Sequence, residues 1–113
     1  MLRSLRRDAG WLAALALLST SGSAARPAGA LNSHTITIEN MQFSPARLSV
    51  HRGDRIVWVN KDLFPHTVTA GNKAFDSGAI EAGGSWTYVA DKSVGYAYSC
   101  TFHPTMKGAI TVQ

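Results

Sequence analysis

The sequence has very little cysteine and no long apolar run. Cys100 is the only cysteine among 113 residues, and a chain with one cysteine cannot form an internal disulfide. The longest apolar stretch, from residue 11 to 18, is far shorter than the ~20 residues of a membrane-spanning helix. These absences exclude a disulfide scaffold, and we expect no stable membrane insertion.

The first 30 residues have the layout of an export signal. Three arginines precede the apolar stretch, and small and polar residues follow it from 19 to 30. This order is typical of a secretory signal peptide, and cleavage after residue 24, 25 or 30 stays open. We therefore expect a periplasmic or otherwise exported protein whose mature part, residues 31–113, is a single domain.

The basic character of the chain belongs to this leader. The whole chain has a net charge of +4, but from residue 31 onward seven Lys and Arg face six Asp and Glu, which leaves +1. A nucleic-acid-binding domain would carry a basic patch of its own. We therefore expect no nucleic-acid partner.

The mature part has no sustained 3.6-residue apolar period. Short stretches rich in β-branched and aromatic residues alternate there with turn residues, which predicts an all-β sandwich or barrel with Greek-key connections. Trp58, Phe75 and Trp86 are candidates for its core. The predicted strands cover residues 34–39, 47–50, 55–60, 66–70, 79–80, 85–90, 95–100 and 108–112.

Three sulfur and nitrogen donors lie close together near the C-terminus. Cys100, His103 and Met106 form a C-x2-H-x2-M arrangement at the end of one predicted strand and in the loop before the next. Thiolate, imidazole and thioether together favour copper, whereas magnesium and calcium prefer oxygen ligands and structural zinc prefers four Cys or His donors. A blue-copper site needs one more imidazole.

His66 supplies that imidazole. It follows Pro65 at the start of a predicted strand, where proline fixes the backbone that enters the site. His34 lies near the start of the mature chain and His51 lies in a polar turn, so we expect both to be exposed surface histidines. The predicted metal ligands are therefore His66, Cys100, His103 and Met106.

Three segments resemble the cupredoxins, in the plastocyanin, pseudoazurin and amicyanin branch. They are residues 53–68 (GDRIVWVNKDLFPHTV), 75–78 (FDSG) and 100–106 (CTFHPTM), and the short ligand loop is most similar to that of amicyanin. The resemblance implies a Greek-key β-sandwich of about eight strands with one type 1 copper near one end. It also implies that His66, Cys100 and His103 are equatorial ligands and that Met106 is the axial one.

This sequence differs from the family directly after His66, where it has Thr67 and the family often has asparagine. We expect the Thr67 hydroxyl to hydrogen bond to Thr101 and so to join the two segments that bear ligands.

The function that follows is one-electron transfer by a soluble monomer that is not an enzyme. The expected partners are redox proteins, and the resemblance alone implies a cytochrome c or a dehydrogenase. A copper carrier or storage protein without a redox role stays open as the alternative. A copper oxidase or nitrite reductase is disfavoured, because His34 and His51 do not cluster as additional ligands would.

Overall fold

Short strands with alternating burial build two facing sheets. The computed structural model describes residues 32–113, so the predicted leader lies outside the described residues. Within 32–113 there is no helix, and hence none that could span a membrane. The strands are β1 (Ser33–Glu39), β2 (Gln42–Ser44), β3 (Arg47–Val50), β4 (Arg55–Asn60), β5 (Thr69–Ala70), β6 (Ser85–Val89), β7 (Gly95–Ser99) and β8 (Lys107–Val112).

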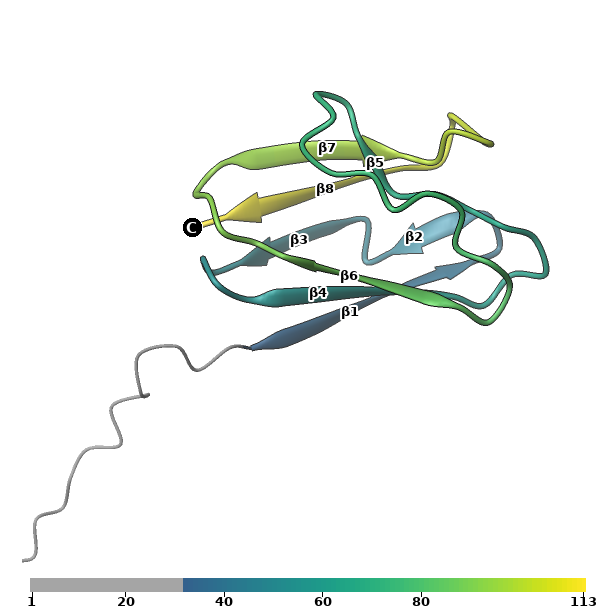
Figure 1. Cartoon of the computed structure of the whole chain (residues 1–113), viewed down its shortest axis with the longest axis horizontal. Coiled ribbons are helices and arrows are strands. Elements are labelled where there is room, and N and C mark those ends of the chain that lie inside the picture. The colour runs from purple at the N-terminus through teal and green to yellow at the C-terminus, as the bar shows by residue number, and fades with distance from the viewer. Residues whose placement is uncertain (1–31) are drawn as a thin grey trace, which may run out of the picture.

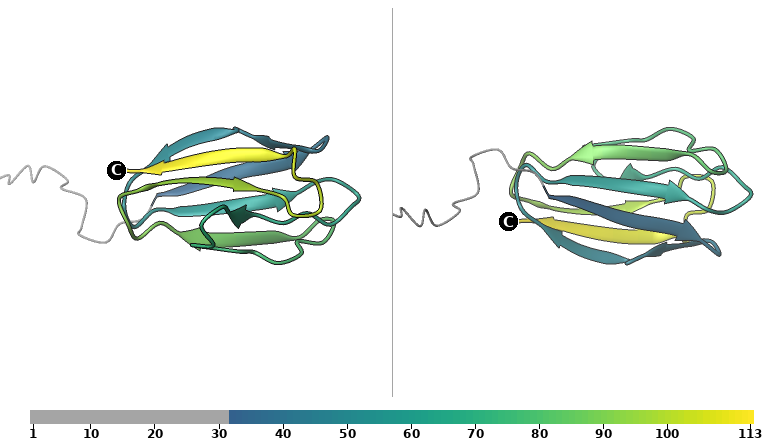
Figure 2. Two further views of the ribbon diagram at one scale, coloured as in Figure 1. Left: turned by 90° about the horizontal axis from the view of Figure 1, so that it is seen from above. Right: turned by 90° about the horizontal axis from the view of Figure 1, so that it is seen from below.

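Each sheet has four strands and mixed pairing. One sheet has the order β2-β1-β4-β6 and the other β3-β8-β7-β5. The pairs β1/β4 and β3/β8 are parallel, and all other pairs are antiparallel. Figure 1 and the two views of Figure 2 show the sheets as the layers of a sandwich. The all-β sandwich prediction is confirmed.

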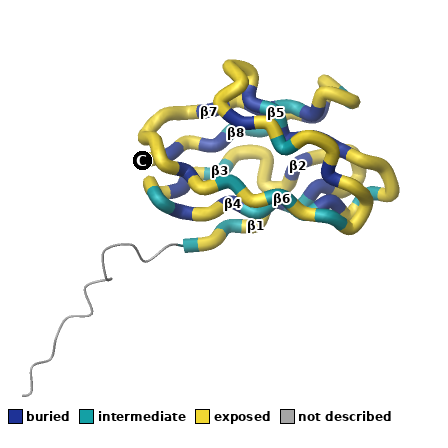
Figure 3. Tube along the Cα trace, in the orientation of Figure 1, coloured by how far each residue is buried: buried dark blue, intermediate teal, exposed yellow. Residues whose placement is uncertain are grey.

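The core lies between the sheets, where buried positions alternate with exposed ones (Figure 3). Trp58 on β4 is fully buried, and its ring meets the Tyr98 ring edge-on with centroids 5.5 Å apart. Phe75 is also buried, whereas Trp86 is only partly buried and packs against the cluster. Two of the three predicted core aromatics are therefore central, and the third closes the side of the core.

The predicted strands differ from the structure in three places. The short strand β2 was not predicted, because three residues with one buried side chain carry too little pattern. The predicted strand 66–70 is reduced to β5, since His66 pairs through an isolated bridge with Ile80. The predicted strand at 79–80 is the other half of that bridge, so residues 66–68 and 79–80 are loop segments joined by two backbone hydrogen bonds.

The segments that carry the predicted ligands meet at one end of the sandwich. The β4–β5 and β7–β8 connections both lie at the end opposite the C-terminus (Figure 1). Because β4 and β7 belong to different sheets, the sandwich brings together residues that are far apart in the sequence.

Candidate metal centre

Two hydrogen bonds with Ile80 hold the backbone of His66. The His66 amide donates to the Ile80 carbonyl at 3.1 Å, and the Ile80 amide donates to the His66 carbonyl at 2.7 Å. The imidazole itself is fully buried. A buried ring on a backbone with two hydrogen bonds has little freedom to move, so its donor atom is held in place without metal.

The second ligand segment is a short closed loop. The Met106 amide donates to the His103 carbonyl at 2.9 Å, and the Cys100 amide donates to the Met106 carbonyl at 3.1 Å. These bonds turn the chain so that the Cys100 and Met106 side chains are both buried. His103 lies at the turn of the loop and is half-buried.

Two of the four predicted donors already face one another. His66 Nδ1 lies 3.8 Å from Cys100 Sγ. With bonds of about 2.0 Å to imidazole nitrogen and about 2.3 Å to thiolate sulfur, as for a zinc ion, a trigonal arrangement places these donors about 3.7 Å apart. The His66 and His103 rings lie across from each other, with centroids 5.5 Å apart. The residues present therefore fit a copper ion with imidazole and thiolate ligands.

The structure preforms a pair of donors and not a complete cage. Within residues 32–113 no three side chains of His, Cys, Asp or Glu are close enough to hold a metal ion by themselves. The pair His66 and Cys100 is fully buried, whereas His103, a further predicted donor, is half-buried in its loop. The fourth predicted donor, the Met106 thioether, is a soft ligand of the kind that suits copper.

Thr67 connects the two ligand segments through both its backbone and its side chain. Its amide lies 3.3 Å from Cys100 Sγ and donates to the sulfur. Its hydroxyl oxygen accepts a hydrogen bond from the Thr101 amide at 2.8 Å and lies 3.1 Å from the Thr101 hydroxyl. The predicted contact between Thr67 and Thr101 is confirmed.

The other nitrogen of His66 contacts a carboxylate. His66 Nε2 lies 2.8 Å from Asp62 Oδ2. Burial raises the pKa of the Asp62 carboxyl, but hydrogen bonds from the Met41 amide, from His66 and from the Asn40 amide outweigh it, and the pKa lies below 3.8. Asp62 is therefore an ionised acceptor at neutral pH.

Asn60 holds the loop that leads to His66. Its fully buried side chain donates from Nδ2 to the carbonyls of Phe64 at 2.7 Å and Ile80 at 2.9 Å, and its Oδ1 accepts from the Asp62 amide at 2.9 Å. Sequence reasoning missed Asn60 and Asp62. The available signal was a short polar residue that ends a buried strand and a second one two residues later, where such side chains often bond to the turn backbone.

The two histidines assigned to the surface behave differently. His51 is exposed, as predicted. His34 is half-buried, and its Nε2 lies 2.9 Å from Asp54 Oδ2, so its assignment as an exposed histidine was wrong. Asp54 is a buried carboxylate that also accepts a hydrogen bond from the His51 amide. This pair organises backbone and belongs to no metal cluster within the described part of the chain.

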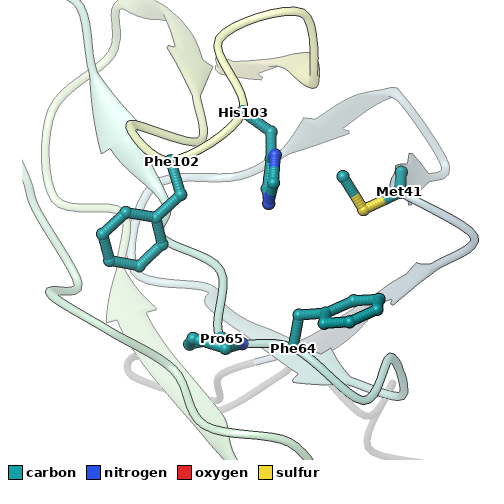
Figure 4. Close-up of a pocket in the computed structure, with 5 residues that line it drawn as sticks. All are labelled: Met41, Phe64, Pro65, Phe102 and His103. Atoms are coloured by element: carbon teal, nitrogen blue, oxygen red, sulfur yellow. The ribbon is translucent and has the colours of Figure 1, made fainter.

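An apolar hollow surrounds His103. Figure 4 shows that its ring points into a space lined by Met41, Phe64, Pro65 and Phe102. Phe64 is 58% exposed and Phe102 is 51% exposed. These side chains form an apolar surface beside His103. We call these five residues the apolar patch.

A family model described as a cupredoxin-like domain matches residues 10–112. The chain belongs to the cupredoxin-like family. Among the relatives of this cupredoxin, plastocyanin of Scenedesmus fuscus is 33% identical over 84 residues, which cover 63% of this chain and 86% of the plastocyanin. Amicyanin of Paracoccus versutus is 27% identical over 83 residues, which cover 69% of this chain. The cupredoxin spans 63% of that amicyanin and of its Paracoccus denitrificans counterpart.

Solved structures agree with this assignment. A structure described as the Cu(I) form of an amicyanin variant is 26% identical and superposes with a TM-score of 0.68, covering 74% of this cupredoxin and 85% of the amicyanin. The predicted resemblance to amicyanin-like cupredoxins and the predicted Greek-key sandwich are confirmed. Copper, the predicted cofactor, is thus the metal of the family's amicyanin structures.

Proposed function

We propose that this cupredoxin is a soluble one-electron carrier with one type 1 copper ion held by His66, Cys100, His103 and Met106. The observation that carries the proposal is the buried pair of His66 Nδ1 and Cys100 Sγ, 3.8 Å apart, which matches a shared trigonal metal. Met106, the proposed weak axial donor, is also buried, and its backbone carbonyl accepts from the Cys100 amide at 3.1 Å. His103 is the remaining imidazole, 5.5 Å from the His66 ring between centroids.

When bound, copper supplies the one-electron couple. The chain supplies a site that changes little between oxidation states, since electron transfer is fast when ligands need not rearrange. The Ile80 bridge fixes His66, the loop hydrogen bonds fix Cys100 and Met106, and burial of all three side chains excludes water. The Thr67 amide donates to the Cys100 sulfur and so stabilises negative charge on it, which is one way in which proteins tune a copper potential.

Electrons would enter and leave through His103. It is the one predicted ligand that is not fully buried, and it lies within the apolar patch. Interfaces between redox proteins are small and short-lived, and a compact apolar surface with a ligand at its centre suits such docking. By similarity to amicyanins, the partners proposed are a dehydrogenase as donor and a cytochrome c as acceptor.

The cupredoxin would perform this function outside the cytoplasm. The leader-like composition of residues 1–30 supports export. The first strand begins at Ser33, after all three candidate cleavage positions. Removal of the leader would therefore leave every strand of the sandwich in place, with residues 31–113 as the mature domain.

A carrier or storage role is less well supported by the geometry. A protein that delivers copper needs donors that a partner can reach, whereas His66, Cys100 and Met106 are all buried. The enclosed donors favour a resident ion and electron exchange.

Addition of Cu(II) to the purified protein tests the proposal. We expect an intense visible absorption from thiolate-to-copper charge transfer and a reversible one-electron potential. Cys100→Ser keeps the side-chain size but removes the thiolate, and it should abolish the colour. His51→Gln, which alters an exposed histidine, should leave the colour unchanged. A colourless wild-type protein, or a coloured Cys100→Ser protein, would refute the proposal.

A further inference from the structure

The carboxylate of Asp62 accepts three hydrogen bonds from two parts of the chain. Its Oδ1 accepts from the Asn40 amide at 2.7 Å, and its Oδ2 accepts from the Met41 amide at 2.9 Å. The same Oδ2 lies 2.8 Å from His66 Nε2. The side chain is 11% exposed, and its contact with His66 is partly buried, whereas its bonds with the Asn40 and Met41 amides lie at the surface.

The donors and acceptors in this cluster determine where the imidazole proton lies. A backbone amide can only donate, and an ionised carboxylate can only accept. Asp62 therefore accepts from Met41 and Asn40, and its contact with His66 is a hydrogen bond only if Nε2 carries the proton. In a neutral imidazole this leaves the lone pair on Nδ1, which is the nitrogen that faces Cys100 Sγ.

The other two bonds of Asp62 hold an unusual turn. Asn40 and Met41 both have positive φ angles, of 55° and 60°. This left-handed conformation is uncommon for residues other than glycine. Asp62 pairs both amides of the turn between β1 and β2, and the turn places Met41 in the apolar patch.

We propose that Asp62 is a positioning residue that fixes the Nδ1 lone pair of His66 toward Cys100 and holds the Met41 turn in the apolar patch. One carboxylate thereby joins a predicted metal ligand to the surface on which partners would dock. The part that concerns copper rests on the proposed function. The parts that concern the imidazole tautomer and the turn do not.

Replacement of Asp62 by asparagine shows why a carboxylate is needed. If the new amide group takes the place of Oδ2, it donates to His66 Nε2, drives the proton to Nδ1 and opposes the Met41 amide. If it takes the place of Oδ1, the tautomer is kept but the Asn40 amide loses its acceptor. An asparagine therefore cannot satisfy all three partners, whereas a glutamate keeps two acceptor oxygens.

The test uses long-range ¹H–¹⁵N NMR spectra of the full chain purified without metal. We expect the wild type to carry the His66 proton on Nε2. Asp62→Asn should shift the proton toward Nδ1 or accelerate amide exchange at Asn40 or Met41. Asp62→Glu should restore the wild-type pattern, and Asp91→Asn, which changes an exposed aspartate, should have no effect.

Copper titration provides the second readout. Loss of a carboxylate partner of a metal-binding histidine typically weakens metal affinity about 10- to 100-fold, and we expect this for Asp62→Asn but not for Asp62→Glu. An Asp62→Asn protein with the wild-type tautomer and wild-type exchange at both turn amides would overturn the inference. A wild type that has the Nε2 proton but forms no coloured copper complex would instead refute the proposed function and leave the role of Asp62 standing.

Discussion

The Thr67 hydroxyl lies between the two segments that carry the predicted ligands. It accepts from the Thr101 amide at 2.8 Å, and the Thr67 amide donates to the sulfur of Cys100. The amide contact depends on backbone position, which the hydroxyl helps to fix. The side chain therefore acts on the metal site through the position of its own backbone.

Thr67→Val should remove the hydroxyl contacts and keep the side-chain shape. We expect a shifted reduction potential and a free energy of unfolding lower by about 1–2 kcal/mol, because the partly buried Thr101 amide loses its acceptor. Voltammetry and denaturant unfolding measure the two effects. The matched control is Thr87→Val on the exposed side of β6. Equal reduction potentials for Thr67→Val and wild type would show that the contact between the Thr67 hydroxyl and Thr101 does not affect the metal.

Asp54 links stability to pH. Hydrogen bonds from His34 and from the His51 amide lower the pKa of the Asp54 carboxyl more than burial raises it. A carboxyl whose pKa is lower in the folded state stabilises the fold fully above its unfolded pKa of about 3.9, and this stabilisation is lost as pH falls through the folded value.

The free energy of unfolding of the metal-free protein should therefore decrease as the pH falls below about 4. Asp54→Asn should be less stable than wild type at pH 7 and should show a shallower decrease. Urea unfolding at a series of pH values measures both. Asp91→Asn serves as the control, and a wild-type slope for Asp54→Asn would contradict the assignment.

The chemistry of the donors could be predicted from the sequence, but their supports could not. Cys100, His103 and Met106 are close in sequence, and their thiolate, imidazole and thioether groups favour copper before any fold is known. Asp62 is 21 and 22 residues from the amides of Met41 and Asn40 that it accepts from. Such contacts depend on how two turns meet in space, which no local pattern encodes.

At the scale of the elements, the pairing of β7 with β8 depends on a close approach at one glycine. Gly108 lies opposite Tyr98 in the register, and a Cβ built on Gly108 would lie 2.3 Å from the Tyr98 ring. The ring is buried and also contacts Phe43 and Trp58. A methyl group at position 108 would therefore overlap a ring that already packs against two other aromatic rings.

Gly108→Ala should therefore destabilise the protein, by about 1–3 kcal/mol or more, as overpacked cores do. Gly95→Ala is the matched control in the same strand pair, because a Cβ there would meet only the Ile110 carbonyl oxygen at 3.9 Å. Denaturant unfolding compares the two. If both substitutions have the same small effect, the strands can separate enough to admit the methyl group.

The strands themselves could be predicted to different degrees. In β4 every second residue is buried. Its run of β-branched and aromatic residues predicts such a strand. The segment from His66 to Val68 has similar residues, yet it is a loop, because an isolated backbone bridge between His66 and Ile80 takes the place of a ladder. Strand propensity gives way there to tertiary contacts.

At the scale of the whole molecule, the sandwich places all the predicted ligands at one end. The all-β class followed from the sequence pattern, but the parallel neighbours β1/β4 and β3/β8 did not. Such pairs join strands that are not connected by a hairpin, so their partners cannot be identified from turn signals. The resemblance to cupredoxins supplied the arrangement that local patterns lack.

The apolar patch should determine how fast the molecule exchanges electrons. Phe102→Glu places a charge beside His103, so that two copies meeting through this surface repel each other and lose apolar contact. We expect the electron self-exchange rate to fall about tenfold or more, with stronger dependence on salt. NMR line broadening in mixtures of oxidised and reduced protein measures this rate. Val94→Glu, at an exposed valine outside the patch, should leave it unchanged. If Phe102→Glu leaves the self-exchange rate unchanged, electrons do not pass through the apolar patch.

The central claim is that four named residues hold one copper ion. The most direct test is a crystal structure of the copper-loaded protein with anomalous data at the copper edge. We predict a single strong anomalous peak bonded to His66 Nδ1, Cys100 Sγ and a ring nitrogen of His103, with Met106 as a longer axial contact. A peak at His34 or His51, or at a site that does not include Cys100, would contradict the claim.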